Sequence, residues 1–220
     1  MQLVLTPELV LEAYRHGLFP MSYSGDSPYV HWVCPKLRGQ LSISNLHIPR
    51  RLKKTLRHAP YDVRVDTAFK AVMEGCAQTK EKRPETWINP SIIESFCALH
   101  EQGHAHSVEC WQDGALVGGV YGLKIGGAFF GESMFQTARD ASKIALVHLT
   151  ARLWRGGFTI FDTQFTNDHL EQFGVYEVQH DEYMKHLQDA ITQDSDFQLR
   201  GLKPKDILDQ YFLMREQRQN

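Results

Sequence analysis

The sequence has few cysteines and no long apolar run, and each absence removes a class of protein. Its four cysteines lie far apart and form no C-x-x-C pair: Cys34, Cys76, Cys97 and Cys110. This spacing favours reduced thiols over a disulfide framework or a zinc site. No apolar run approaches the roughly 18 residues of a membrane helix, and the start of the chain lacks the basic segment and cleavage site of a signal peptide. We therefore expect a cytoplasmic protein with neither a membrane span nor a bound metal.

Net charge is also small, but charge is unevenly distributed along the chain. The formal net charge over 220 residues is −2, which does not favour general nucleic-acid binding. From Lys36 to Tyr61, however, there is no acidic residue, and most basic residues of this interval fall within 48–58. On a helix, Arg50, Lys54 and Arg57 would share one face and form a positive patch that can contact RNA phosphates. The alternative is an ordinary solvated helix face.

A lone carboxylate, Glu132, stands in an apolar segment that reads as a β-strand. With the strand period of two, Ala128, Phe130, Glu132 and Met134 would share one face. Gly131, beside the acid, leaves the backbone open to close approach. Core packing prefers Val or Leu to a carboxylate, so Glu132 is a candidate functional residue.

A second apolar strand, GFTIFDTQF at 157–165, also carries polar groups. Asp162 and Gln164 would share one face, and Phe165 would lie on the other. We predict that the two strands are neighbours and that Glu132, Asp162 and Gln164 line one site. A structural alternative for Asp162 is a carboxylate satisfied by nearby backbone amides.

The predicted elements follow an α+β order. Helices are expected at 67–79 and 91–102, a β-meander at 104–111, 116–125 and 128–135, a helix at 141–154 and then the strand 157–165. We expect an α+β protein with a mixed sheet flanked by helices. It would comprise a small N-terminal α+β domain at 1–37 and a catalytic domain at 38–220. Residues 22–35 are expected to form a structured loop that includes one short strand, and 80–87 a charged surface loop leading to Trp87.

The order of meander, helix and strand resembles the acyl-coenzyme A N-acyltransferase (GNAT) fold. That fold usually carries a Q/R-x-x-G-x-G/A loop whose amides hold the pyrophosphate of coenzyme A. The corresponding stretch here, QTARDASK at 136–143, has no glycine, which argues against a coenzyme A nest. The amides at the start of the following helix, with Arg139 beside them, can still hold one phosphate.

The string HEQGH at 100–104 matches the H-E-x-x-H motif of zinc peptidases. That motif needs an uninterrupted helix, which places two histidines one turn apart and supplies a glutamate as base. Gly103 stands where helical periodicity stops and strand alternation begins, so His104 is expected to leave the helix. We therefore assign no metal site to these residues.

Several strings along most of the chain occur in the order of one known family. They are LHIPR (46–50), TWIN (86–89), LHEQGHAHSVECW (99–111), LVGGVYG (116–122), FFGESMF (129–135), ASKIAL (141–146) and DTQF (162–165). Together they resemble the leucyl/phenylalanyl-tRNA–protein transferases. The resemblance implies a bacterial enzyme that transfers Leu or Phe, with Met as a third candidate, from aminoacyl-tRNA to proteins beginning with Arg or Lys. Such products are marked for degradation by the N-degron pathway. No cofactor is implied, and a monomer is sufficient.

The resemblance also implies roles for the polar residues of the two strands. Asp162 would orient Gln164, whose carbonyl accepts a proton or hydrogen bond from the attacking amine, and Glu132 would hold an amino group at the reacting centre. In a rival account these groups only position the substrates, and a ribose hydroxyl of the tRNA carries the proton. Both accounts suit aminolysis of an activated ester, which needs positioning, proton removal and oxyanion stabilisation but no covalent nucleophile.

Contacts with the acylated end of the tRNA follow from the same resemblance. Candidates for the apolar pocket that receives the donor side chain are Trp87, Phe129 and Met134, with Gly131 beside them. Such a pocket discriminates by about 1–3 kcal/mol per methylene, so its shape can favour Leu and Phe over β-branched residues. Met21 stands where relatives carry a Trp, at the expected stacking position of the 3′ adenosine.

The basic segment matches the family as well. Arg50, Lys54 and Arg57 correspond to its cluster for the tRNA acceptor stem, a backbone contact that should be salt-sensitive. At 173–183 the sequence FGVYEVQHDEY departs from the usual F/L-G-A-x-E-x-P/R-R. Two other classes of function remain open: an acyl-coenzyme A N-acetyltransferase and a non-catalytic tRNA-binding adaptor on the same fold.

Overall fold

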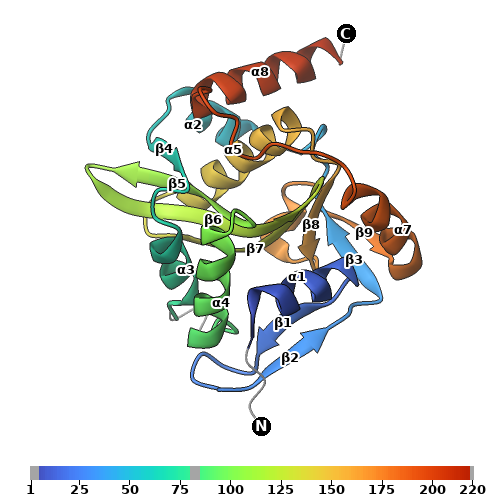
Figure 1. The fold of residues 1–220 in the computed structure, drawn as a ribbon. Coiled ribbons are helices and arrows are strands. Elements are labelled where there is room, and N and C mark those ends of the chain that lie inside the picture. The colour runs from blue at the N-terminus through green and yellow to red at the C-terminus, as the bar shows by residue number, and fades with distance from the viewer. Residues whose placement is uncertain (1–4, 80–84, 219–220) are drawn as a thin grey trace.

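The computed structural model describes residues 5–79 and 85–218 of the chain (Figure 1). The helices are α1 (Pro7–Arg15), α2 (Arg50–Arg57), α3 (Phe69–Ala77), α4 (Pro90–Glu101), α5 (Ala141–Arg155), α6 (Asp168–Glu171), α7 (His180–Ala190) and α8 (Pro204–Gln217). The strands are β1 (Phe19–Ser22), β2 (Val30–Val33), β3 (Leu37–Gln40), β4 (Asp62–Val65), β5 (Ala105–Gln112), β6 (Ala115–Ile125), β7 (Ala128–Gln136), β8 (Ile160–Gln164) and β9 (Tyr176–Gln179).

A mixed seven-stranded sheet, in the order β4-β5-β6-β7-β8-β3-β9, forms the centre of the molecule. The meander β5-β6-β7 is antiparallel, whereas β7 and β8 are parallel because helix α5 connects them across the sheet. Strands β1 and β2 form a separate hairpin. These findings confirm the expected α+β class, the mixed sheet and the adjacency of the two polar strands.

Helices cover both faces of this sheet (Figure 1). Helices α2, α5 and α8 contribute to one hydrophobic core, and α1, α3, α4 and α7 contribute to the other. Helix α5 is buried along most of its length because it lies between the sheet and α8. The sheet therefore separates the basic helix α2 from the N-terminal helix α1.

Local signals account for the helix ends. Thr6 caps α1 by accepting a hydrogen bond from the Leu9 amide at 3.3 Å. Helix α4 ends at Glu101, and Gly103 has a φ of +79°, a left-handed conformation that suits glycine. His104 therefore lies outside the helix, as predicted, and HEQGH does not form a metal-binding helical pair.

The N-terminal hairpin and the tail complete the fold. The predicted loop at 22–35 contains one short strand, β2, as expected, and β1 precedes the loop and pairs with β2. The tail forms a 14-residue helix, α8, whose polar sequence gives little periodicity. Of the charged loop at 80–87, residues 80–84 lie outside the described residues. None of the helices within 5–79 and 85–218 is long and apolar enough to cross a membrane.

Candidate active site

Glu132 occupies a β-bulge in the middle of β7. Tyr121 of β6 pairs with Ser133, but the next residue, Gly122, pairs with Gly131, so Glu132 is the extra residue of the bulge. A side chain at Gly122 would overlap the Phe130 carbonyl oxygen, and the glycine thus permits this close approach. Bulges re-aim side chains, and here the bulge turns the Glu132 carboxylate towards α1.

The bulge also corrects the prediction that Met134 shares a face with Glu132. Phe130 contacts Tyr14 of α1, with ring centroids 4.9 Å apart, in one core. Beyond the bulge the alternation is shifted by one residue, and Met134 packs against the opposite core. The period of two fails here because one extra residue moves every later side chain of the strand to the opposite face of the sheet.

Strands β7 and β8 approach each other where the polar residues lie. Their parallel register pairs Phe130 with Asp162. A Cβ at Gly131 would lie 2.9 Å from the ring of Phe161, so this glycine keeps the strands close at the next position. The Glu132 carboxylate and the end of β8 are thereby brought within hydrogen-bonding distance.

Asp162 is fully buried and accepts four hydrogen bonds from three donors. Both of its oxygens accept from the Nε of Arg38, at 3.0 and 2.9 Å, and the Tyr183 hydroxyl donates to Oδ2. Its Oδ1 also accepts from the Gln164 backbone amide at 2.7 Å. Backbone amides therefore account for only one of the hydrogen bonds to Asp162, and its main partner is the buried guanidinium of Arg38 on β3.

Arg38 links three elements around Asp162. Its side chain has no exposed surface, and its guanidinium lies 4.8 Å from the ring centres of both Phe19 and Tyr183. Its Nη1 donates to the Gly17 carbonyl at 2.8 Å. Burial is the largest single influence and acts to lower the pKa of Arg38, but Asp162, Tyr183 and Tyr14 together outweigh it and the net pKa is raised.

Gln164 adopts an unusual backbone conformation for a non-glycine residue. Its φ is +59°, and the Asp162 carboxylate holds this turn through the Gln164 amide. The turn changes the direction of the chain, so the ring of Phe165 meets that of Phe19 at 5.5 Å. Phe19 belongs to the same core as Tyr14, and the prediction that Phe165 lies on the other face is therefore wrong.

Glu132 receives two hydrogen bonds on one oxygen. The Tyr14 hydroxyl donates to Oε1 at 2.7 Å, and the Gln164 side-chain amide donates to the same atom at 2.9 Å. With its nitrogen bound to Glu132, the Gln164 amide directs its carbonyl oxygen away from that carboxylate, where it can accept a substrate N–H. Burial and the Glu132 charge both raise the pKa of Tyr14, so its hydroxyl stays a donor.

The surroundings of Glu132 favour its protonated form. Burial raises the pKa of its carboxyl to about 8, and the Asp162 charge adds to the rise, although Tyr14, Arg38 and Gln164 oppose it. Glu132 is nevertheless not completely shielded, since part of its surface is exposed. A bound ammonium group would favour the ionised carboxylate and reverse the shift.

This shift predicts a pH dependence of stability. Because the folded-state pKa of Glu132 is raised from 4.5 to about 8, the native protein retains a proton that the unfolded chain loses. The free energy of unfolding should therefore fall as pH rises between these values, and Glu132→Gln should flatten that slope. Urea denaturation at pH 5, 6.5 and 8 measures it, with exposed Glu94→Gln as control. An unchanged slope in Glu132→Gln would contradict the assignment.

The remaining candidates for the donor pocket lie on both faces of the sheet. Phe129 is fully buried in the core beneath α5, where its ring packs against Phe158, Phe161 and Phe197. Trp87 and Met21 pack against the core that contains Tyr14. The Trp87 carbonyl also accepts from the Ser22 amide at 3.1 Å, which fixes this segment to the N-terminal hairpin. The structure thus brings Trp87 and Met21, but not Phe129 or Met134, to the Tyr14 side of the sheet.

The basic residues of α2 form a separate surface. Arg50, Lys54 and Arg57 are exposed, while Leu52 and Leu56 of the same helix pack into the core on the α5 side. Among the ion pairs found in the described part of the chain, none involves these three cations. They are free to meet an external anion, and helix α2 lies on the opposite face of the sheet from helix α1 (Figure 1).

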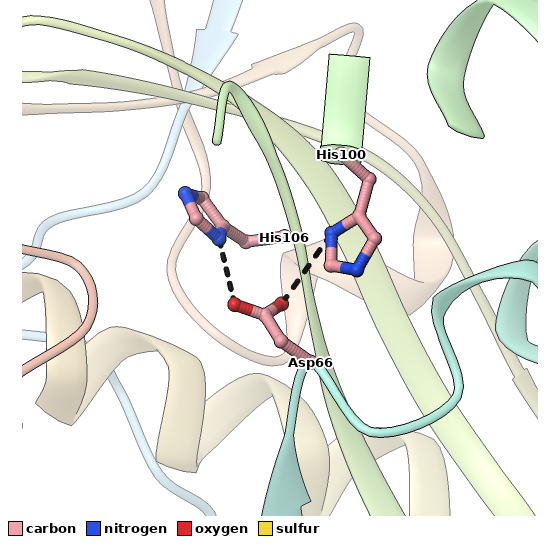
Figure 2. A group of neighbouring side chains, drawn as sticks. All are labelled: Asp66, His100 and His106. Carbon is pink, nitrogen blue, oxygen red and sulfur yellow. Dashed lines mark hydrogen bonds and ion pairs between the residues drawn. The ribbon is translucent and has the colours of Figure 1, made fainter. Parts of the chain in front are cut away.

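A second polar cluster lies at the end of β4 (Figure 2). Ligand atoms of Asp66, His100 and His106 lie within 4.8 Å of one another, as in a metal site. The His106 Nδ1 is, however, 2.8 Å from Asp66, and the His100 Nδ1 is 2.7 Å from the Ala105 carbonyl. A nitrogen bound to a carbonyl oxygen carries the proton and offers no lone pair to a metal.

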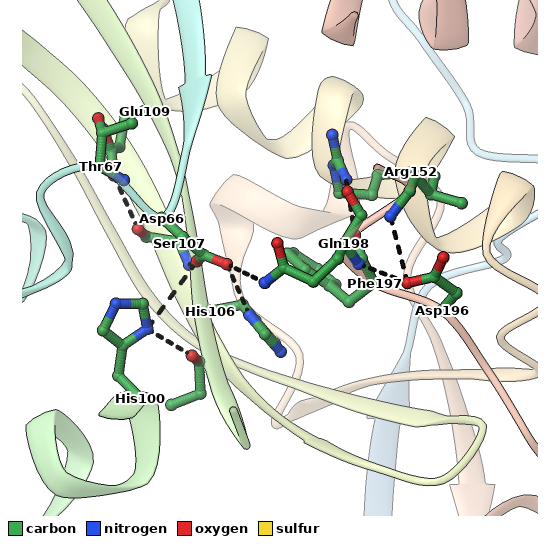
Figure 3. A network of polar contacts seen from close by, with 12 residues as sticks. Asp66, Thr67, His100, His106, Ser107, Glu109, Arg152, Asp196, Phe197 and Gln198 are labelled. Atoms are coloured by element: carbon green, nitrogen blue, oxygen red, sulfur yellow. Dashed lines mark hydrogen bonds and ion pairs between the residues drawn. The ribbon is translucent and has the colours of Figure 1, made fainter. Parts of the chain in front are cut away.

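The same cluster continues into the C-terminal segment (Figure 3). Gln198 donates to Asp66 at 2.9 Å, and Phe197 stacks on the ring of His106 at 4.1 Å. The buried Arg152 donates to the carbonyl oxygens of Phe197 and Gln198. Burial opposes ionisation of Asp66, but His106 and backbone donors lower its pKa overall. The arrangement anchors the chain that leads into α8 and has the character of a structural network.

Three residues of the site have no distinct signal in the sequence. Tyr14 lies in the apolar stripe of α1, Arg38 is the second residue of a short strand, and Tyr183 occupies an amphipathic helix, so each reads as an ordinary member of its element. The only hint is Arg38, a charge within an otherwise uncharged strand. Their contact with Glu132 or Asp162 depends on packing between distant elements.

Comparison with known proteins gives the family. The family described as "Leucyl/phenylalanyl-tRNA protein transferase" matches residues 40–188, and its N-terminal domain matches residues 4–36. Proteins named leucyl/phenylalanyl-tRNA–protein transferase from Paramagnetospirillum magneticum and Nitrobacter winogradskyi are each 52% identical over 88% of this chain, which is 92% and 86% of their lengths. One from Hyphomonas neptunium is 51% identical over 87% of this chain and 74% of its own. The chain therefore belongs to the leucyl/phenylalanyl-tRNA–protein transferase family of aminoacyltransferases.

Proposed function

We propose that this protein transfers Leu or Phe, with Met as a third candidate, from aminoacyl-tRNA to the N-terminal Arg or Lys of acceptor proteins. The products would be marked for degradation by the N-degron pathway, and an aminoacyl-tRNA substrate implies action in the cytoplasm. The contact between Glu132 and Gln164 carries the proposal, because it joins an acid to an amide at the end of β8.

The reaction replaces an ester by an amide. The acceptor α-amine attacks the aminoacyl carbonyl carbon, the bond to the ribose oxygen breaks, and the proton lost by the amine ends on that oxygen. We assign the Gln164 carbonyl to the attacking amine and Glu132 to an amino group at the reacting centre, while Asp162 holds Gln164 in position. The proton passes either through Gln164 or through the neighbouring ribose hydroxyl.

The donor side chain would enter an apolar region on the Tyr14 side of the sheet. Trp87 and Met21 supply apolar surface there, and Met21 replaces the Trp that relatives carry for the 3′ adenosine. Phe129 and Met134 would act indirectly, by packing β7 from the opposite core. Gly131 would keep the strands close enough for the site to form.

The architecture supports a GNAT-like interpretation. A meander, the helix α5 and a strand parallel to β7 follow one another, and the pairing of β7 with β8 stops at Phe130 and Asp162. We propose that the acylated end of the tRNA occupies the position of an acyl thioester in that fold. Residues 1–37 would form the small N-terminal domain and 38–220 the catalytic domain, acting as a monomer.

The decisive experiment tests transfer directly. Leu-charged tRNA is mixed with the protein and a peptide that begins with Arg, and mass spectrometry follows the addition of Leu to its N-terminus. No adduct with Leu, Phe or Met donors would overturn the proposal. Binding of charged tRNA without transfer would favour an adaptor, and turnover of acetyl-coenzyme A would favour an acetyltransferase.

The basic patch on α2 should contribute a salt-dependent part of tRNA affinity. Changing both Arg50 and Lys54 to Ala should weaken binding at low salt and reduce the slope of log K against log salt by about 2. Binding is measured by filter retention at salt concentrations from about 50 to about 300 mM, which span the physiological value. The exposed cations Lys70 and Lys185, changed together to Ala, serve as control. Equal slopes for both pairs would remove α2 from the RNA-binding surface.

A further inference from the structure

A cavity of about 580 Å³ lies on the face of the sheet opposite Glu132. It is enclosed by the end of α2, the start of β4, helix α5 and the first half of α8. Its volume is within the range of small-molecule sites, about 300–1,000 Å³. It contains none of the residues assigned above to amino-acid transfer, although Arg57 of the basic patch lines it.

The interior of the cavity is rich in rings and uncharged. Tyr61, His148 and Phe212 line it and are all partly buried. The Tyr61 hydroxyl donates to the Arg139 carbonyl at 2.7 Å, which fixes the ring. Burial lowers the pKa of His148 to about 4, so its imidazole is neutral at physiological pH. Flat ring surfaces of this kind stack on aromatic ligands.

The rim of the cavity is cationic. Arg57, Lys203 and Lys205 line it and are exposed, and the Lys53 ammonium lies 5.4 Å from the ring centre of Phe212. Two carboxylates also line it. Asp62 is paired with Arg64 at 2.7 Å, whereas Asp209 makes no ion pair within the described residues. Positive charge therefore dominates the entrance, next to the start of helix α8, where the helix dipole adds to it.

We propose that this cavity binds one nucleotide of the tRNA, with its base among the three rings and its phosphates on Arg57, Lys203 and Lys205. The inference rests on the proposed tRNA substrate and extends it. The bound nucleotide is not the esterified terminal one, because the sheet separates the cavity from Glu132 (Figure 1). Base stacking combined with phosphate contacts is how proteins hold unpaired nucleotides.

Charge favours RNA over the other substrate of the reaction. An acceptor protein that begins with Arg or Lys carries positive charge at the end that is recognised, and the cationic rim repels it. The cavity is also continuous with the exposed patch of α2, since Arg57 belongs to both. Its α8 wall lies beyond residue 188, where the family match ends, so the contact would be an addition to the family's common domain.

The test compares two donors that reach different parts of the protein. Leu-tRNA held at the acyl-transfer site is long enough to contact the cavity at the same time, whereas leucyl-adenosine held at that site cannot reach across the sheet. Phe212→Ala should weaken tRNA binding about tenfold, the scale of one stacked base. Separately, Lys203→Gln with Lys205→Gln should weaken binding by a similar factor, because two phosphate contacts are lost. Turnover of leucyl-adenosine should stay within about twofold of wild type under the same conditions, as expected for a site remote from the chemistry.

Controls separate the cavity from folding and from the reaction itself. Lys70→Gln with Lys185→Gln should leave tRNA affinity unchanged, and thermal unfolding identifies any variant that is not native. If Phe212→Ala is unfolded, the tRNA affinity of the Lys203→Gln, Lys205→Gln variant still tests the inference, because both lysines are exposed. A second measurement titrates AMP against the imidazole resonances of His148, which should shift in wild type and not in the lysine variant.

Unchanged tRNA affinity in both cavity variants, with a silent His148 signal, overturns the inference while leaving the transferase proposal intact. If neither donor is turned over, the transferase proposal fails. The tRNA affinities and the AMP titration then still decide whether the cavity binds nucleotides.

Discussion

Arg38→Ala should destabilise the protein by about 3–5 kcal/mol and abolish amino-acid transfer, because it leaves the Asp162 carboxylate buried without its main partner. Neither side chain has exposed surface, so water cannot replace the guanidinium. The change also removes the donor to the Gly17 carbonyl and the cation between the rings of Phe19 and Tyr183. Urea denaturation, together with the transfer assay, measures both effects.

Two further variants separate the charge of Arg38 from its shape. Arg38→Lys keeps the charge but has a single ammonium in place of the planar fork, so it should recover only part of the stability. Arg38→Met combined with Asp162→Leu removes both charges and should recover more, since buried ion pairs are often replaceable by apolar residues of similar volume. Transfer should remain absent in the double variant. A loss below about 1 kcal/mol in Arg38→Ala would mean that the pair behaves like a surface salt bridge.

The parts of the fold that were predictable rest on local signals. Asp113-Gly114 and Gly126-Gly127 mark the turns of the meander, and the strands between them alternate clearly. The adjacency of β7 and β8 follows from the strand, helix and strand order, since such crossovers join parallel neighbours. Glu132, Asp162 and Gln164 could therefore be grouped from the sequence by their positions on these strands.

The supporting residues could not be predicted in this way. Strand β3 lies between β8 and β9, although it precedes β8 by more than a hundred residues along the chain, and only this long-range pairing brings Arg38 to Asp162. The bulge at Glu132 is defined by its register against Tyr121 rather than by any residue type. Tyr14 reaches Glu132 only through the packing of α1 on the sheet. Each of these depends on tertiary contacts that periodicity does not report.

Gln164→Ala should lower kcat/KM for transfer from Leu-tRNA by about 100-fold, the scale of losing one positioned proton-transfer group. Affinity for the charged tRNA should change little, because the RNA contacts assigned to α2 and α8 lie on the other face of the sheet. The matched control is Thr163→Ala, the preceding residue on β8, whose hydroxyl donates to the Phe165 carbonyl and makes no other hydrogen bond within residues 5–79 and 85–218. A loss of affinity equal to the loss of rate would make Gln164 a binding residue instead.

A substrate lacking the ribose hydroxyl beside the ester distinguishes the two proton routes. If Gln164 accepts the proton, removing that hydroxyl should cost the wild-type enzyme little, and Gln164→Ala should cost the same with either donor. If the hydroxyl carries the proton, its removal should slow the wild type by about 100-fold or more. With the substrate that lacks the hydroxyl, Gln164→Ala would then reduce the rate by a smaller factor than it does with the normal substrate. The effects of two groups that serve one step are not additive. The coupling energy from this cycle therefore assigns the proton, while the Asp162 and Arg38 contacts hold Gln164 in place under either route.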